Sequence, residues 1–252
     1  MTEVSSLKIC VLSGRYPESA FNANVNHFIY CDIHKYTYIY CNWPTKAHNR
    51  YMNKIEYIRH YYDLFDYIFW IDDDAFFINM EKGLEEFLPR NENFLSICSS
   101  PDYKNIHTFI SSGQFMIKCS DLGKKFIEEI YKVDLAEVKK WWDDSLGYYT
   151  NGDQDAIVFL LKTHPEFKDR YKRYHYSKFN SRVEEIFDKG GVENLFIVHI
   201  TGTPKNKLKD YIRVQKYLNR SPSLVDRSIE GRYNLPKKRK TILDHLFILS
   251  RK

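Results

Sequence analysis

Residues 67–77 read YIFWIDDDAFF, an apolar stretch that carries three consecutive carboxylates in its middle. The first five residues are apolar throughout, which is typical of a central strand covered on both faces. Burying an ionised carboxylate is costly unless a cation or a hydrogen-bonding partner compensates. The stretch therefore predicts a buried strand ending at Ile71, with Asp72, Asp73 and Asp74 at its carboxyl end beside a cation or another charged partner.

The segments around this strand alternate between strand-like and helix-like patterns. Apolar runs predict further strands at residues 7–12, 36–42, 94–100, 113–119 and 194–200. Apolar spacings of three and four predict helices at residues 22–31, 49–65, 121–133 and 153–162, the third with Ser120 as its N-cap. The alternation predicts an α/β sandwich with a mostly parallel sheet. In such sheets ligands bind beyond the carboxyl ends of the strands.

The positive charge of the chain is concentrated at its C-terminal end. Residues 232–252 carry seven Lys or Arg and one acid, a charge of +6, whereas the whole chain carries +5. The main body is therefore slightly acidic, which argues against a nucleic-acid partner. We expect a catalytic domain at residues 1–215 and a basic extension at residues 216–252. The extension predicts either an amphipathic helix in peripheral contact with an anionic membrane or a helix packed on the domain.

Cysteine content and the N-terminal sequence bear on the compartment. The five cysteines form no C-x-x-C pair, and we expect them to be reduced, buried thiols. No apolar run approaches the length that crosses a bilayer, and residues 1–14 lack the basic-then-apolar layout of a signal peptide. These features predict a cytoplasmic protein.

The spacing of Asp72 and Asp74 suits a hard divalent cation. In an extended segment residues i and i+2 point the same way, so both carboxylates can reach one ion. Mg²⁺ or Mn²⁺ takes such oxygen ligands and commonly shares its coordination shell with substrate phosphates. Asp73 would then point away or cap the following turn. The alternative is a solvated acidic turn, which the preceding apolar run disfavours.

His199 is a second candidate ligand, because it ends the predicted strand at 194–200 and precedes TGTPKNK, residues 201–207, which we expect to be a loop. In that loop Gly202 permits close approach of the backbone to a ligand, and Lys205 and Lys207 could reach a diphosphate. The alternatives are a histidine satisfied within the core and a flexible loop with solvated lysines.

Three further patterns are candidates for substrate contact. Asp153, Gln154 and Asp155 open an apolar helix, where they could face the ligand cleft or simply cap the helix. Gly113 before a strand permits a ligand near the backbone, although a plain turn explains it equally well. Sugars stack on aromatic rings, so the cluster Trp141, Trp142, Tyr148 and Tyr149 is either an acceptor subsite or core packing.

Five segments occur in an order that resembles glycosyltransferase family 34, the galactosyl-, mannosyl- and xylosyltransferases of the Gma12/Mnn10 type. The resemblance runs from about residue 24 to residue 207. The segments are NHFIYCDIHKY, YMNKIEYIRHYYDLFDYIFWIDDDAFFINME, SSGQFMIKCSDLGKKFIEEIYK, DQDAIVFLL and FIVHITGT. The Asp-x-Asp pattern alone is a weak signal, but five segments in the family order are a much stronger one. The resemblance implies the glycosyltransferase A fold, with a Rossmann-like, mixed but mostly parallel sheet flanked by helices.

The resemblance also implies a reaction and roles for individual residues. The reaction would be metal-dependent transfer of a hexose or pentose from a UDP- or GDP-linked sugar to a hydroxyl of a glycan or glycolipid, with retention of the α configuration. Mn²⁺ or Mg²⁺ would be held by Asp72, Asp74 and His199. The donor would be contacted by Asp72, Lys54, Gly113, Gly202 and Lys205, and the transferred sugar by Asp153, Gln154 and Asp155.

Two other functions remain open. Haloacid dehalogenase-like phosphatases also place Asp-x-Asp after an apolar strand. Their motif usually lies on the first strand and is followed by Thr or Val, whereas Ala75 follows here. A non-catalytic module that binds sugar nucleotides or glycans would keep the same fold, but it would have no need for Asp72, Asp74 and His199 together.

Overall fold

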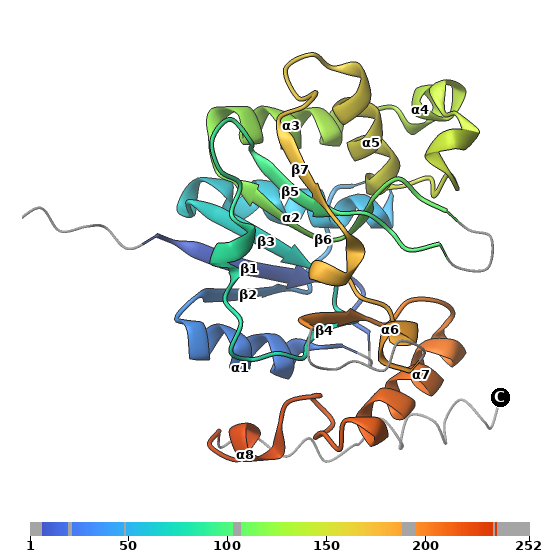
Figure 1. Ribbon diagram of the computed structural model, residues 1–252. Helices are drawn as coiled ribbons and strands as arrows, with labels where there is room; N and C mark the ends of the chain where they lie inside the picture. The colour runs from blue at the N-terminus through green and yellow to red at the C-terminus, as the bar shows by residue number, and fades with distance from the viewer. Residues whose placement is uncertain are drawn as a thin grey trace, which may run out of the picture.

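The computed structural model describes residues 7–19, 22–47, 49–102, 107–187, 195–233 and 235. A six-stranded sheet lies at the centre, with helices on both of its faces (Figure 1). Its strands, in spatial order, are β2 (Thr37–Cys41), β1 (Ile9–Gly14), β3 (Tyr67–Ile71), β6 (Ser111–Lys118), β5 (Leu95–Cys98) and β7 (Tyr171–Tyr174). All neighbours are parallel except β6, which runs antiparallel to β3 and β5. The predicted α/β class and the mixed, mostly parallel sheet are confirmed.

The described helices pack on this sheet, on the small second sheet or on one another. They are α1 (Asn24–His34), α2 (Asn53–Tyr61), α3 (Asp121–Lys132), α4 (Leu135–Trp141), α5 (Asp153–Thr163), α6 (Val183–Phe187), α7 (Pro204–Tyr217) and α8 (Arg227–Glu230). Short 3-10 turns extend α2 on both sides, at Arg50–Met52 and Tyr62–Leu64. Three more lie at Leu84–Phe87, Asp144–Leu146 and Tyr176–Lys178. The expected N-cap is present, because Ser120 Oγ accepts a hydrogen bond from the Gly123 backbone N–H.

The strand β3 lies at the middle of the core, as its apolar sequence predicts. Ile68 and Trp70 pack on one face with residues of α2, α3 and α5, while Phe69 and Ile71 pack on the other with residues of α1. All four are at most 1% exposed. A strand covered on both faces needs an apolar residue at every position, and YIFWI meets that requirement.

The chain turns directly after β3 instead of staying extended. The Ala75 backbone N–H donates to the Asp72 carbonyl at 3.1 Å, and a short strand β4 (Ala75–Phe77) begins there. The expected late strand forms as β8 (Ile197–His199), in a separate two-stranded sheet with β4. In that antiparallel pair Ala75 lies opposite His199. The expectation of an extended Asp72–Asp74 segment is therefore wrong, and the turn brings it alongside His199.

The predicted loop at residues 201–207 is also wrong beyond residue 203. Thr203 caps a helix, because its hydroxyl accepts from the Asn206 backbone N–H, and Pro204 occupies the first turn of α7. Proline is well suited to that position, since the first helical N–H groups have no partner within the helix. Lys205 and Lys207 are thus held on the first turn of α7.

The described part of the C-terminal extension packs on the domain. The boundary expected after residue 215 falls inside α7, and Leu224 and Val225 beyond it are fully buried. The Asn26 side chain donates to the Ser223 carbonyl at 3.1 Å. The predicted membrane-binding helix falls mainly on residues 236–252, outside the described residues. Within the described part of the chain, no helix is both long and apolar enough to cross a bilayer.

Candidate metal centre and cavity

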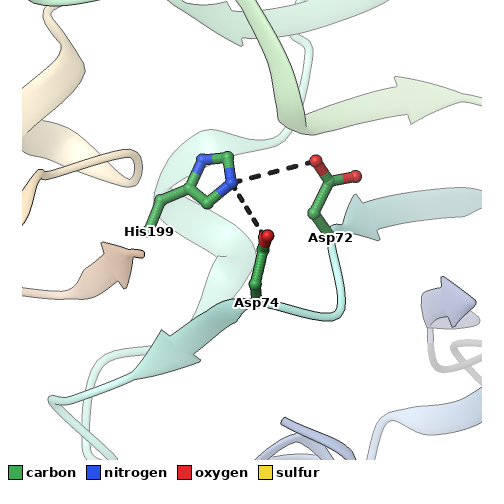
Figure 2. A group of neighbouring side chains, drawn as sticks. All are labelled: Asp72, Asp74 and His199. Carbon is green, nitrogen blue, oxygen red and sulfur yellow. Dashed lines mark ion pairs between the residues drawn. The ribbon is translucent and has the colours of Figure 1, made fainter. Parts of the chain in front are cut away.

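Asp72, Asp74 and His199 converge beyond the carboxyl end of β3 (Figure 2). His199 Nε2 lies 3.0 Å from Asp74 Oδ1 and 3.9 Å from Asp72 Oδ2. One ligand atom from each of the three residues lies within 4.8 Å of the other two. The structure therefore brings together all three residues that the sequence proposes as metal ligands, two from the β3–β4 turn and one from the end of β8.

Each aspartate has one oxygen held by the protein and the other facing the imidazole. Asp72 Oδ1 accepts from Trp70 Nε1 at 2.8 Å and from Lys54 Nζ at 3.2 Å. Asp74 Oδ2 forms an ion pair with Lys207 from α7. The remaining oxygens, Asp72 Oδ2 and Asp74 Oδ1, are the ones nearest to His199 Nε2. This arrangement orients the carboxylates before any ligand arrives.

The protonation states suit a cation. Burial lowers the pKa of His199, although the neighbouring Asp74 opposes the shift. A neutral imidazole is the form that binds metals. Burial alone would raise the pKa of Asp74, but the contacts with His199 and Lys207 outweigh burial and lower it. Burial thus disfavours the charged form of His199, while its neighbours favour the charged form of Asp74.

A divalent cation fits this group. Asp74 Oδ1 is buried and accepts no hydrogen bond from any described residue, so it is a ligand atom without a partner. Two carboxylates and one imidazole are a usual donor set for Mn²⁺, whereas Mg²⁺ prefers oxygen ligands alone.

Gly113 on β6 leaves room for the imidazole. A Cβ at this position would lie 2.4 Å from His199 Cε1 and 3.2 Å from Asp72 Oδ2. Real Cβ atoms do not approach ring atoms so closely, so a side chain here would displace the histidine. The sequence proposes Gly113 as a contact of the donor. The structure shows that Gly113 also leaves the space that the His199 ring occupies.

Asp73 contacts a different residue from its two neighbours. Its Oδ1 lies 3.5 Å from an Arg15 nitrogen. Burial, reinforced by the charge of Asp74, raises the pKa of Asp73, while Arg15 opposes the shift. Arg15 is thus the partner that makes the middle carboxylate tolerable in this apolar part of the chain.

Lys54 on α2 connects the candidate metal centre to α5. Its Nζ lies 3.2 Å from Asp72 Oδ1 and 3.1 Å from Asp153 Oδ2, and it donates to the Ser112 carbonyl at 3.0 Å. Burial would lower the pKa of Lys54, but the two carboxylates raise it. Burial raises the pKa of Asp153, and Lys54 limits the shift. The structure places Lys54 beneath the site, between the two carboxylates.

A cavity of about 840 Å³ opens over these residues. Most of the residues proposed from the sequence line it: Lys54, Asp72, Gly113, Asp153, Gln154, His199 and Gly202. Gln154 Oε1 accepts from the Ser112 backbone N–H at 3.2 Å, which holds the amide at the cavity wall. Lys205 is exposed and does not line the cavity, whereas Lys209 and Arg213 of the same helix do.

The sequence leaves open whether Asp153, Gln154 and Asp155 cap the helix or face the ligand. In the structure Asp155 has the capping role. Its Oδ2 accepts from the backbone N–H groups of Thr150, at 2.9 Å, and Gly152, at 3.1 Å. Asp155 is fully buried and does not line the cavity. The three residues thus divide, with Asp153 and Gln154 at the cavity and Asp155 holding the start of α5.

The predicted aromatic cluster divides in the same way. Trp142 Nε1 donates to the Gly147 carbonyl and Tyr149 Oη to the Leu135 carbonyl, so both side chains serve packing. Tyr148 is 61% exposed and lines the cavity. Tyr51, which the sequence suggests only as part of the apolar side of a helix, is 46% exposed and lines the cavity too. The sequence feature that points to a cavity role for Tyr51 is its position at the N-terminal end of that helix.

Two residues around His199 carry no signal in the sequence. Arg182 lines the cavity next to His199, and Asn180 is fully buried behind the imidazole. Both come from the segment between α5 and β8, where no periodic pattern or motif marks them. Only the tertiary structure, which pairs Ser181 with Val198 of β8, brings them to the site.

Comparison with known proteins identifies the fold. Residues 13–97 match the galactosyl transferase GMA12/MNN10 family. A search of curated proteins found no match. A glycosyltransferase involved in glycosylation of the major capsid of PBCV-1 aligns with a TM-score of 0.62 at 15% identity, covering 81% of this chain and 99% of that one. GlyE of Streptococcus pneumoniae TIGR4 aligns with a TM-score of 0.52 at 15% identity, covering 93% of this chain and 66% of that one.

At these identities the structural likeness shows the fold and leaves the substrates open. The resemblance predicted from sequence motifs is confirmed over the first of its segments and the β3 stretch, which fall within the matched residues. The chain has the glycosyltransferase A fold, and its residues 13–97 are similar to the galactosyl transferase GMA12/MNN10 family.

Proposed function

We propose that this protein is a metal-dependent glycosyltransferase. It moves a hexose or pentose from a UDP- or GDP-linked sugar to a hydroxyl of a glycan or glycolipid, with retention of the anomeric configuration. The observation that carries the proposal is the convergence of Asp72, Asp74 and His199 beyond the carboxyl end of a central strand, where Asp72 and His199 line the cavity. Ligands of open α/β sheets bind at this edge.

Asp72 Oδ2, Asp74 Oδ1 and His199 Nε2 would hold the cation, and the imidazole favours Mn²⁺ over Mg²⁺. When bound, the cation neutralises charge on the departing nucleoside diphosphate. The protein prepares for this on its own, because Trp70, Lys54 and Lys207 fix the other oxygens of the two carboxylates.

The residues of α5 act on the sugar. The transition state of glycosyl transfer has oxocarbenium character, so a carboxylate or amide oxygen near the anomeric carbon stabilises it. Asp153 and Gln154 stand at the cavity wall with that chemistry. Burial raises the pKa of Asp153, and Lys54 limits that rise, which favours the negative charge that a cationic transition state requires.

The acceptor would lie at the outer part of the cavity. Tyr51 and Tyr148 present exposed rings there, and the apolar face of a sugar ring packs on such rings. Two rings at a cavity edge suit a glycan better than a small alcohol.

A thermal-shift panel of UDP- and GDP-sugars, with Mn²⁺ and with EDTA, tests the proposal. We expect one donor to raise the melting temperature only when Mn²⁺ is present, and slow Mn²⁺-dependent hydrolysis of the same donor. Hydrolysis separates the enzyme from a non-catalytic binding module, and release of phosphate from a simple phosphomonoester would identify a phosphatase. Stabilisation by no donor, or equal stabilisation with EDTA, contradicts the proposal.

A further inference from the structure

Asn180 and Arg182 contact the side of the His199 ring that faces away from the candidate metal ligands. His199 Nδ1 lies 3.1 Å from Asn180 Oδ1, while Nε2 faces the carboxylates of Asp72 and Asp74 (Figure 2). Asn180 is fully buried. The Ser181 backbone N–H donates to the Ile197 carbonyl and the His199 N–H to the Ser181 carbonyl, so this segment is fixed against β8.

The arginine determines which way the Asn180 amide faces. Arg182 NH1 lies 2.6 Å from Asn180 Oδ1 and 3.0 Å from the Asn180 carbonyl oxygen. A guanidinium has donors and no acceptor, so the amide must present its oxygen there rather than its NH₂ group. The same oxygen therefore also faces His199 Nδ1.

The Asn180 amide, oriented in this way, stabilises the imidazole tautomer that carries its proton on Nδ1. Arg182 NH1 has two hydrogens, and its two shortest contacts are to the oxygens of Asn180, whereas His199 Nδ1 is farther away at 3.3 Å. The Asn180 oxygen has lone pairs only, so a favourable contact at 3.1 Å requires the proton on Nδ1. A neutral imidazole with its proton on Nδ1 carries its lone pair on Nε2.

We propose that Asn180, oriented by Arg182, is a positioning residue that accepts the Nδ1 proton of His199 when a metal takes the Nε2 lone pair. This inference rests on the proposed metal-dependent function. Without a cation, the ionised Asp74 Oδ1 at 3.0 Å favours the proton on Nε2. A cation placed between these two atoms excludes that proton, so the neutral ring carries its proton on Nδ1, where the Asn180 oxygen accepts it.

The tautomer can be observed directly. Long-range ¹H–¹⁵N correlation of the histidine rings at pH 8, recorded with and without the diamagnetic cation Cd²⁺, separates the two tautomers, and the His199→Gln variant identifies the signals of His199. We expect the Nδ1–H pattern in the cation-bound wild-type protein. A cation-bound wild-type protein without a proton on Nδ1 of His199 overturns the inference, whether or not the variants fold.

Metal affinity provides the second measurement. By calorimetry with Mn²⁺ we expect Asn180→Ala to bind about 10–100-fold more weakly than wild type, the usual effect of losing a hydrogen-bond partner of a metal-bound histidine. Asn180→Asp keeps an acceptor oxygen for both Nδ1–H and Arg182, so it should recover most of the lost affinity. Arg182→Met removes the donor that orients the amide and should weaken binding as well. Lys178→Ala, an exposed residue of the same segment, is the matched control.

The outcomes separate this inference from the proposed function. Absence of Mn²⁺ binding by the wild-type protein contradicts the proposed function. Wild-type affinity in Asn180→Ala contradicts the positioning role while leaving the proposed function standing. Equal loss in Asn180→Ala and Asn180→Asp also contradicts it, because a packing role, unlike an acceptor role, gives that pattern.

Discussion

Asp74 is the residue on which metal binding should depend most. It offers a buried oxygen without a hydrogen bond to any described residue and lies nearest to His199 Nε2. In Asp74→Asn the ligand charge is lost, and Lys207 loses its carboxylate partner. We expect Mn²⁺ binding to disappear in calorimetry and kcat/KM for transfer to fall at least about 100-fold, equivalent to ~2.7 kcal/mol.

Asp169→Asn is the matched control for this substitution. Asp169 is exposed and has a left-handed backbone, which asparagine also adopts readily. It should transfer sugar and bind Mn²⁺ like wild type. Full activity in Asp74→Asn would remove the metal centre from the reaction.

We expect Tyr51 and Tyr148 to contact the acceptor and not the donor. Each ring is exposed at the cavity, and loss of one stacking contact costs about 0.5–1.5 kcal/mol. We expect Tyr148→Ala to raise the KM for the acceptor about 2–10-fold and to leave Mn²⁺-dependent hydrolysis of the donor unchanged. Tyr217→Ala, an exposed tyrosine outside the cavity, should change neither. Equal effects of Tyr148→Ala on hydrolysis and transfer would assign the ring to the donor instead.

At the scale of elements, β6 approaches the end of β8 so closely that only glycine fits between them. In Gly113→Ala the new Cβ would meet His199 Cε1 at 2.4 Å, so the ring must move away from Asp72 and Asp74. We expect a loss of about 1–3 kcal/mol in the free energy of unfolding, as for other overpacked positions, together with weaker Mn²⁺ binding. Denaturant unfolding and calorimetry measure the two effects separately. Unchanged Mn²⁺ affinity would show that His199 is not a ligand.

Lys54 ties together α2, β3 and α5, because it offsets the buried charges of both Asp72 and Asp153. In Lys54→Met these charges lose their partner, which should cost about 3–5 kcal/mol in the free energy of unfolding. The pKa of Asp153, already raised by burial from its usual 3.8, should rise further. A raised carboxyl pKa means that the folded state binds protons more tightly than the unfolded state, so stability is lost as pH rises through the folded-state pKa.

The pH series of this variant is the check. We expect urea unfolding of Lys54→Met to show a smaller deficit relative to wild type at pH 5 than at pH 8. A loss of stability relative to wild type that grows as the pH falls would contradict the role of Lys54 in offsetting the charges of the carboxylates.

The elements also show where sequence patterns suffice. The strand β3 and the helix α3 with its Ser120 cap are local features, and their patterns predict them. The strand β4 is three residues long and carries no pattern of its own. The sequence pattern does not predict the start of α7, because Gly202, Thr203 and Pro204 indicate a turn. A threonine followed by proline can equally begin a helix, and it does so here. Asn180 and Arg182 matter through contacts with β8, which local sequence does not record.

At the scale of the whole molecule, the candidate site depends on two sheets meeting. β3 of the central sheet delivers Asp72, and the small β4–β8 sheet delivers His199 opposite the start of β4. Residues far apart in sequence thus become neighbours through one turn and one strand pair. A cation bound to all three ligands would link the two sheets, so metal binding and global stability should be coupled.

This coupling has a measurable size. A ligand that binds only the folded state stabilises it by about 2.7 kcal/mol when its free concentration is 100 times its dissociation constant. For a chain of this length that corresponds to a rise of about 5–10 °C in melting temperature. We expect Mn²⁺ to produce such a rise over EDTA in the wild-type protein and in Asp169→Asn, and none in His199→Gln. A rise of the same size in His199→Gln would place the bound metal elsewhere, and the link between the two sheets through His199 would have to be abandoned.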